Sequence, residues 1–95
     1  MKSKEAYRHS PDVVSRQIGD EIVLMHLDSG TYFGLNQVGS LIWELTGESP
    51  QSLSALRDRI VEEFDVAGEV AEQDLIKLLE QLASRGLMIA EQTSV

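Results

Sequence analysis

Side chains that could perform catalysis or hold a metal are few and scattered in this chain. His9 and His26 are the only imidazoles, cysteine is absent, and no clustered carboxylates accompany either histidine at metal-ligand spacing. The acidic residues Glu62-Glu63 and Asp65 are typical of a solvated helix end, and no Ser-His-Asp motif is present. The glycines do not form a phosphate-binding pattern. We therefore expect no metal site, no cofactor and no enzymatic activity.

The backbone of one segment offers another kind of chemistry, hydrogen bonding to a second chain. Residues Thr31-Tyr32-Phe33-Gly34-Leu35 have the composition of a short aromatic strand. As the last strand of a meander it would lie at a sheet edge, where unpaired N–H and C=O groups can template another strand. No proline or lysine protects this edge, and Gly34 permits close backbone approach. These features favour peptide capture by strand addition, unless a helix or a second copy covers the edge.

The segments before this strand predict the rest of the meander. Val13–Ile18 and Ile22–Leu27 have strand composition, and Gly19-Asp20 between them suits a two-residue hairpin turn. The run Ile22-Val23-Leu24-Met25 is apolar at every position, which predicts burial on both faces or a position at the centre of the sheet. Asp28-Ser29-Gly30 supplies the second turn.

Three helices are predicted after the sheet. Asn36 is a good N-cap, and the apolar residues that follow it recur at helical spacing until Gly47. Ser49-Pro50 predicts the start of a second helix that reaches Phe64. A third helix is predicted over about residues 71–85, with Gly86 as its C-cap.

This order of elements predicts the fold class and the domain limits. Three strands followed by three helices indicate an α+β, winged-helix-like domain with a three-stranded antiparallel sheet. We assign residues 12–90 to this domain. Residues 1–11 are polar and are predicted to form a flexible N-terminal arm, and residues 91–95 a frayed C-terminus.

The third helix carries a wider apolar stripe than one core contact requires. Leu75, Leu79 and Leu82 form its centre, with Leu78 on one flank and Ile76 on the other. The stripe spans roughly 160°, against about 100° for an ordinary surface helix. Either the helix is deeply buried, or one flank lines a groove. The sequence does not indicate which flank that would be.

Charge argues against nucleic acid and membrane partners. The formal net charge is -8, which repels phosphate backbones and anionic lipids. The last two helices have the spacing of a helix-turn-helix, but the helix that would read DNA, Glu72 to Arg85, is acidic. An acidic winged-helix regulatory or dimerisation module is the alternative. No apolar run is long enough to span a membrane or serve as a signal peptide, so we expect a cytoplasmic protein.

These residues resemble the PqqD-like family, the peptide-recognition domains of ribosomally made and modified peptides. The matching run is Asp28-x-Gly30-x-Tyr32-Phe33-x-Leu35-Asn36-x-x-Gly39-x-x-Ile42-Trp43. A second match comprises Phe64-Asp65-Val66, Asp74-Leu75, Leu78-Leu79, Leu82 and Gly86-Leu87. Within the family, the sequence is most similar to the stand-alone leader-binding proteins of lasso-peptide clusters.

The resemblance implies a non-catalytic protein that binds the leader of a precursor peptide. The leader would add as an antiparallel strand to Thr31–Leu35 and pack against the third helix. Asp74, Leu75, Lys77 and Leu78 would form the groove wall, with an aromatic or proline side chain of the leader in the pocket. Implied partners are a leader peptidase and a macrolactam synthetase in lasso biosynthesis. The alternative is a peptide chaperone for a radical SAM enzyme in quinone-cofactor synthesis. A monomer or a weak homodimer is expected.

Overall fold

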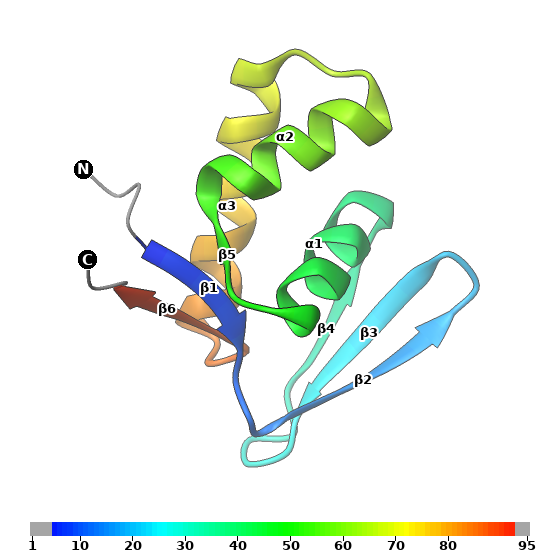
Figure 1. Cartoon of the computed structure of the whole chain (residues 1–95). Coiled ribbons are helices and arrows are strands. Elements are labelled where there is room, and N and C mark those ends of the chain that lie inside the picture. The colour runs from blue at the N-terminus through cyan, green and yellow to red at the C-terminus, as the bar shows by residue number, and fades with distance from the viewer. Residues whose placement is uncertain (1–4, 93–95) are drawn as a thin grey trace.

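The computed structural model describes residues 5–92 and arranges them in six strands and three helices (Figure 1). The strands are β1 Glu5–His9, β2 Val13–Ile18, β3 Glu21–His26, β4 Tyr32–Leu35, β5 Gln51–Ser52 and β6 Met88–Gln92. The helices are α1 Gln37–Glu48, α2 Leu53–Phe64 and α3 Gly68–Ser84. None of these three helices is long and apolar enough to cross a membrane.

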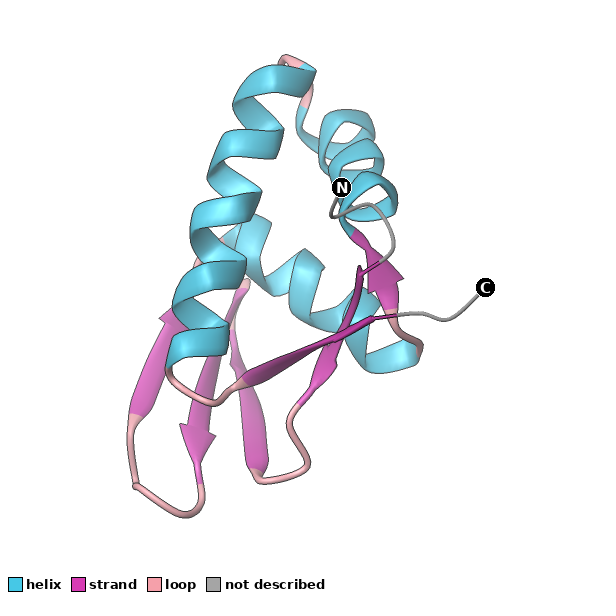
Figure 2. Cartoon of the chain, turned by 90° about the vertical axis from the view of Figure 1, so that its left-hand side faces the viewer, coloured by secondary structure: helices cyan, strands magenta, loops and turns pink. Residues whose placement is uncertain are grey.

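The strands form two antiparallel sheets where the sequence predicted one. The first sheet has the order β2-β3-β4 and is the expected meander, and the second has the order β5-β1-β6. Helix α1 contacts strands of both sheets and lies between them (Figure 1), while α3 runs down towards the strands in Figure 2. The predicted α+β class and the three helices are confirmed, and the second sheet was missed.

The predicted flexible arm is wrong for residues 5–9, which form β1. Ala6 pairs with Ser52 on one side and with Glu91 on the other, and its side chain is buried. Both partners are distant in sequence, so no local pattern could indicate this pairing. The predicted frayed C-terminus is likewise wrong for residues 91 and 92, which belong to β6. Residues 1–4 and 93–95 lie outside the described part of the chain.

Local capping signals explain where α1 and α2 begin. The Asn36 side chain accepts a hydrogen bond of 2.9 Å from the backbone N–H of Gly39, as predicted for an N-cap. For α2 the cap is Ser52, which accepts from the N–H of Ala55, and not Ser49-Pro50 as predicted. The two residues of β5 occupy the gap, because the chain first pairs with β1 before it turns into the helix.

The end of α3 confirms the prediction for Gly86. Gly86 has φ +73° and its N–H bonds the carbonyl of Ala83. The N–H of Leu87 bonds the carbonyl of Leu82, which completes a Schellman motif, and both leucines are fully buried. This turn directs the chain into β6.

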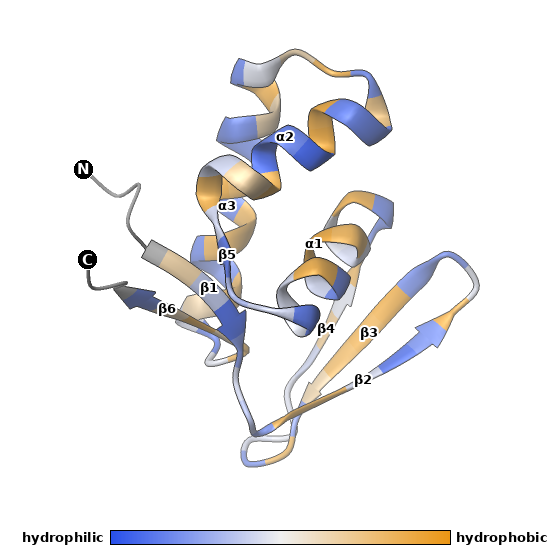
Figure 3. Ribbon diagram, viewed as in Figure 1, coloured by the Kyte–Doolittle hydropathy of each residue, from blue (hydrophilic) through white to orange (hydrophobic). Residues whose placement is uncertain are grey.

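The core lies between the helices and one face of the β2-β3-β4 sheet. Ile22 and Leu24 of β3 are buried, whereas Val23 and Met25 are only half-buried. Burial of β3 on both faces is therefore wrong, but the alternative, a position at the centre of the sheet, is confirmed by the order β2-β3-β4. The strand is hydrophobic along most of its length (Figure 3). The largest fully buried side chains are Leu24, Ile42, Leu56, Leu75, Leu82 and Leu87.

A stacked pair of rings joins β1 to α1. The centroids of the His9 and Trp43 rings are 3.4 Å apart, and the interplanar angle is 12°. The Nε2 atom of His9 lies 2.7 Å from the backbone carbonyl of Trp43, so Nε2 carries the proton and donates it. Burial lowers the pKa of His9 below its ordinary value, and the bond to Trp43 opposes part of that shift.

Gly47 makes room for this stack. A Cβ at Gly47 would lie 2.8 Å from Cε1 of His9. Alanine in a helix interior is normally about 1 kcal/mol more stable than glycine, but here the ring would have to leave Trp43. We expect Gly47→Ala to lower stability in urea denaturation, and the double variant His9→Ala, Gly47→Ala to recover the helical gain. Stabilisation by Gly47→Ala alone would contradict the close packing.

Mild acid should weaken the same contact. Because the pKa of His9 is lower in the folded protein than in the unfolded chain, the unfolded chain binds more protons between the two values. The free energy of unfolding should therefore fall as the pH drops below about 6.5, the ordinary histidine value. Urea midpoints at pH 7.5, 6.5 and 5.5 would measure this. In His9→Phe the decline over that interval should be smaller, and an equal decline would show that His9 is not its source.

Candidate peptide-binding site

Strand β4 is an edge of its sheet. Among the described residues it pairs only with β3, in the register Met25↔Tyr32 and Val23↔Gly34. The N–H of His26 donates to the carbonyl of Thr31 at 2.9 Å, which fixes the hydrogen-bonding phase of the pair. Because bonded and non-bonded positions alternate in an antiparallel ladder, Tyr32 and Gly34 direct their N–H and C=O groups away from β3.

The two faces of β4 differ in their surroundings. Leu35 is buried and Phe33 is half-buried against the core, so these two side chains lie on the inner face. Tyr32 is 68% exposed and lies with Gly34 on the outer face. A strand added at this edge would place alternate side chains on each of the two faces.

One flank of α3 approaches β4 at the inner face. The guanidinium carbon of Arg85, the C-cap residue of α3, lies 5.2 Å from the centre of the Phe33 ring, within cation–π range. Leu78 lies on the same flank of the helix and, like Phe33, packs against the core. The Leu78 flank is therefore the one that faces β4, while Ile76 on the other flank lines a separate hollow of about 310 Å³.

The predicted groove residues on α3 have different environments. Leu78 is half-buried and Asp74 is exposed, both on the flank that faces β4. Leu75 is 1% exposed and belongs to the core, so it supports the groove without lining it. Lys77 is exposed and lies about 100° around the helix from Leu78. Asp74 and Leu78 thus lie on the side of α3 that faces β4, whereas Leu75 lies in the core and Lys77 lies on another side of the helix.

Arg85 is the residue that the sequence reasoning left out of the site. Its position on the Leu78 flank follows from helical spacing, but its contact with Phe33 depends on how α3 crosses the sheet. That crossing is a property of the whole fold, and no pattern within either segment specifies it. The half-buried Thr31 bonds β3 through its carbonyl, so it holds the turn and offers little to an added strand.

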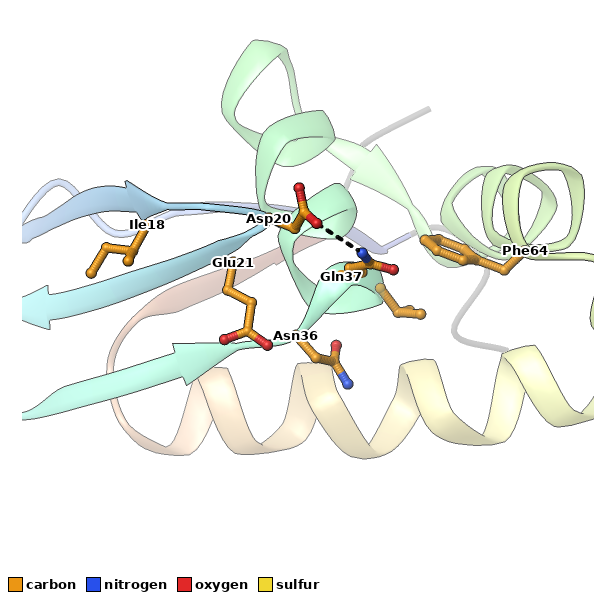
Figure 4. Close-up of a pocket in the computed structure, with 7 residues that line it drawn as sticks. Ile18, Asp20, Glu21, Asn36, Gln37 and Phe64 are labelled. Atoms are coloured by element: carbon orange, nitrogen blue, oxygen red, sulfur yellow. Dashed lines mark hydrogen bonds between the residues drawn. The ribbon is translucent and has the colours of Figure 1, made fainter.

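A separate hollow of about 530 Å³ lies beside the first turn of α1 (Figure 4). Asp20 accepts a hydrogen bond from the Gln37 side chain, and Glu21 stands next to it. A helix N-terminus attracts anions, but these two carboxylates already supply negative charge there. We assign this hollow no ligand. No group of three or more potential metal ligands occurs within residues 5–92.

The chain is similar to a known protein family and to two solved structures. The family model of coenzyme PQQ synthesis protein D (PqqD) matches residues 21–88. Among solved structures, TbiB1 in complex with the TbiA(beta) leader peptide is 41% identical, with a TM-score of 0.79, and the match covers 93% of this chain and 99% of that one. A second structure, lasso peptide synthetase B1 complexed with the leader peptide, is 25% identical with a TM-score of 0.77. That match covers 87% of this chain and 96% of the other.

No protein among those with curated descriptions matches this chain. The family model covers β3, β4, all three helices and the turn into β6, which is more than half of the sequence. The resemblance stated from the sequence is confirmed, and the chain belongs to the PqqD family.

Proposed function

We propose that this protein binds the leader segment of a ribosomally made precursor peptide by adding it as a strand to β4. The observation that carries the proposal is the uncovered edge at Tyr32 and Gly34, next to the α3 flank that holds Leu78 and Arg85. Both similar solved structures are complexes with leader peptides, which supports this assignment.

The physics of strand addition accounts for the expected affinity. Main-chain hydrogen bonds to Tyr32 and Gly34 hold the peptide without regard to its sequence, and side-chain pockets on the two faces add selectivity. A leader that is disordered before binding loses conformational entropy as it becomes a strand. Affinity is therefore moderate for the area that is buried.

The protein performs no reaction in this proposal. It brings the precursor to a leader peptidase, and in lasso biosynthesis also to a macrolactam synthetase, in the cytoplasm. Holding the leader raises the local concentration of the rest of the precursor at the enzyme. A monomer suffices for this role, and weak self-pairing through the β4 edge would compete with the leader.

The match to the coenzyme PQQ synthesis family supports a second candidate, a peptide chaperone for a radical SAM enzyme. Both candidates bind a leader and differ in the enzyme that receives it. Co-purification with a peptidase or with a radical enzyme encoded nearby distinguishes them. The acidic regulatory module is the third candidate, and a gel shift on duplex DNA at low salt tests it.

Leader binding is tested by fluorescence polarisation. The probes are the labelled leader of the nearest encoded small precursor and, as a second peptide, the TbiA(beta) leader. We expect saturable one-to-one binding of at least one probe, and no binding of a scrambled peptide of equal composition. Because the protein carries a charge of -8, the titration is repeated at 0.15 and at about 0.5 M salt, where non-specific attraction is screened.

The controls separate specific from electrostatic binding. Equal binding of the scrambled peptide, or binding that disappears at high salt, would mean that charge alone attracts the leader. Failure of the folded protein to bind either probe would contradict the proposed function and favour the dimerisation alternative.

A further inference from the structure

The glycine at position 34 has no explanation within the chain's own fold. Glycines 19, 30 and 86 adopt positive φ, but Gly34 does not. A Cβ at Gly34 would meet no atom within 4 Å, so close packing does not exclude a larger residue either. Glycine inside a strand lowers its stability. Gly34 therefore leaves an open slot on the outer face that the isolated protein does not use.

This slot opens beside a hollow on the same face, whose lining combines apolar side chains with Ser15 and Arg16. Val23 lies directly across from Gly34, and Tyr32 lies two residues before it on the same side. The hollow has a volume of about 420 Å³ and extends over Val23 and Met25 to β2. Three apolar side chains around it are exposed: Val14 at 44%, Ile18 at 59% and Tyr32 at 68%. No described element covers this face.

The alternation of hydrogen-bonded positions along β4 determines which side chains of an added strand would lie on the outer face. In an antiparallel pair, a residue bonded to Gly34 places its side chain on the same face as the Gly34 position. That side chain would lie over the slot, on the outer face. The next residue of the peptide would point to the inner face, towards Phe33 and Arg85. The outer slot and the inner groove therefore contact neighbouring residues of one peptide.

We propose that the leader residue paired with Gly34 carries a large apolar side chain, which lies across Gly34 on Val23 and against Tyr32. Gly34 thus selects for side-chain size at one leader position. Large side chains stabilise an edge glycine when they cover it from the neighbouring strand. This inference rests on the proposed function and deepens it, because it names the kind of residue that the outer face accepts.

The variant Gly34→Val tests the slot without removing the strand edge. Valine keeps the backbone N–H and C=O, favours strand conformation and fills the slot. We expect at least tenfold weaker binding of the leader probe that the parent binds, with no loss of thermal stability. An alanine scan of that leader should identify one large apolar residue that contributes to binding by the parent. Replacing it with alanine should restore binding to Gly34→Val in a double-mutant cycle.

A matched control adds valine elsewhere in the same sheet. Gln17 is an exposed residue of β2 on the inner face, and Gln17→Val should leave leader binding unchanged. If Gly34→Val binds the leader like the parent while Gly34→Pro binds it more weakly, the proposed side-chain slot is contradicted, but strand addition is supported. Weak binding by Gly34→Val that no leader alanine restores also overturns the slot. Failure of the parent to bind either probe overturns the proposed function itself, and this inference with it.

Discussion

Replacing Gly34 with proline is expected to weaken leader binding at least tenfold while the fold persists. The Gly34 N–H points away from β3 at the open edge, and proline removes this donor and places ring atoms where the added strand would lie. One lost hydrogen bond is worth about 1 kcal/mol, and the steric conflict adds to it. Since about 1.4 kcal/mol corresponds to tenfold in affinity, polarisation titrations should show at least a tenfold weaker complex.

The second edge of the same sheet supplies a matched control. The N–H of Leu27 bonds the carbonyl of Asp12, which sets the phase of β2 and leaves the Ser15 N–H pointing outward. Ser15→Pro therefore makes the same change on the opposite edge, and leader affinity should not change. Tyr32→Pro removes the other outward donor of β4 and serves if Gly34→Pro unfolds. Loss of binding in Ser15→Pro alone would show that the leader binds at the β2 edge and not at β4.

Features that depend on adjacent residues could be predicted from the sequence. The Gly19 turn, the Asn36 cap and the Gly86 C-cap need only a few neighbouring residues to form. The meander and the α3 stripe likewise follow from short-range periodicity. Leu75, Leu79 and Leu82 are all buried, as the centre of that stripe predicts.

The second sheet could not be predicted because its pairings join the two ends and the middle of the chain. Strand β5 has only two residues, too few to show a period, and Ser49-Pro50 imitates a helix start immediately before it. Tyr7 pairs with Gln51 and with Ala90, and neither partner signals the other locally. Such contacts arise from the folded arrangement as a whole.

The candidate site was predicted in part for the same reason. Local pattern predicts strand β4 itself. That β4 has a free edge depends on the sheet order, because β2 pairs with β3 and does not return to pair with β4. The helix flank that faces it follows from the contact of Arg85 with Phe33, which are 52 residues apart in numbering. Leu75 was assigned to the groove through the family resemblance, and its burial places it in the core.

Truncating Leu24 is expected to produce the largest loss of stability among the strand residues discussed. Leu24 is fully buried, and its partner across the pair is Phe33 on the inner face of β4. Leu24→Ala removes buried methyl groups and leaves a cavity, at a cost of about 2–5 kcal/mol. Domains of this size are stable by only about 5–15 kcal/mol, so urea denaturation should show a much lower midpoint with an unchanged slope.

Met25 provides the comparison within the same strand. Its side chain is half-buried on the outer face, so Met25→Ala should lower the free energy of unfolding by less than Leu24→Ala. The difference between the two variants measures how one-sided the burial of β3 is in solution. If both variants lose the same amount, the outer face is covered in the isolated protein. Dimerisation through this face would then have to be displaced before a leader side chain could enter the slot at Gly34.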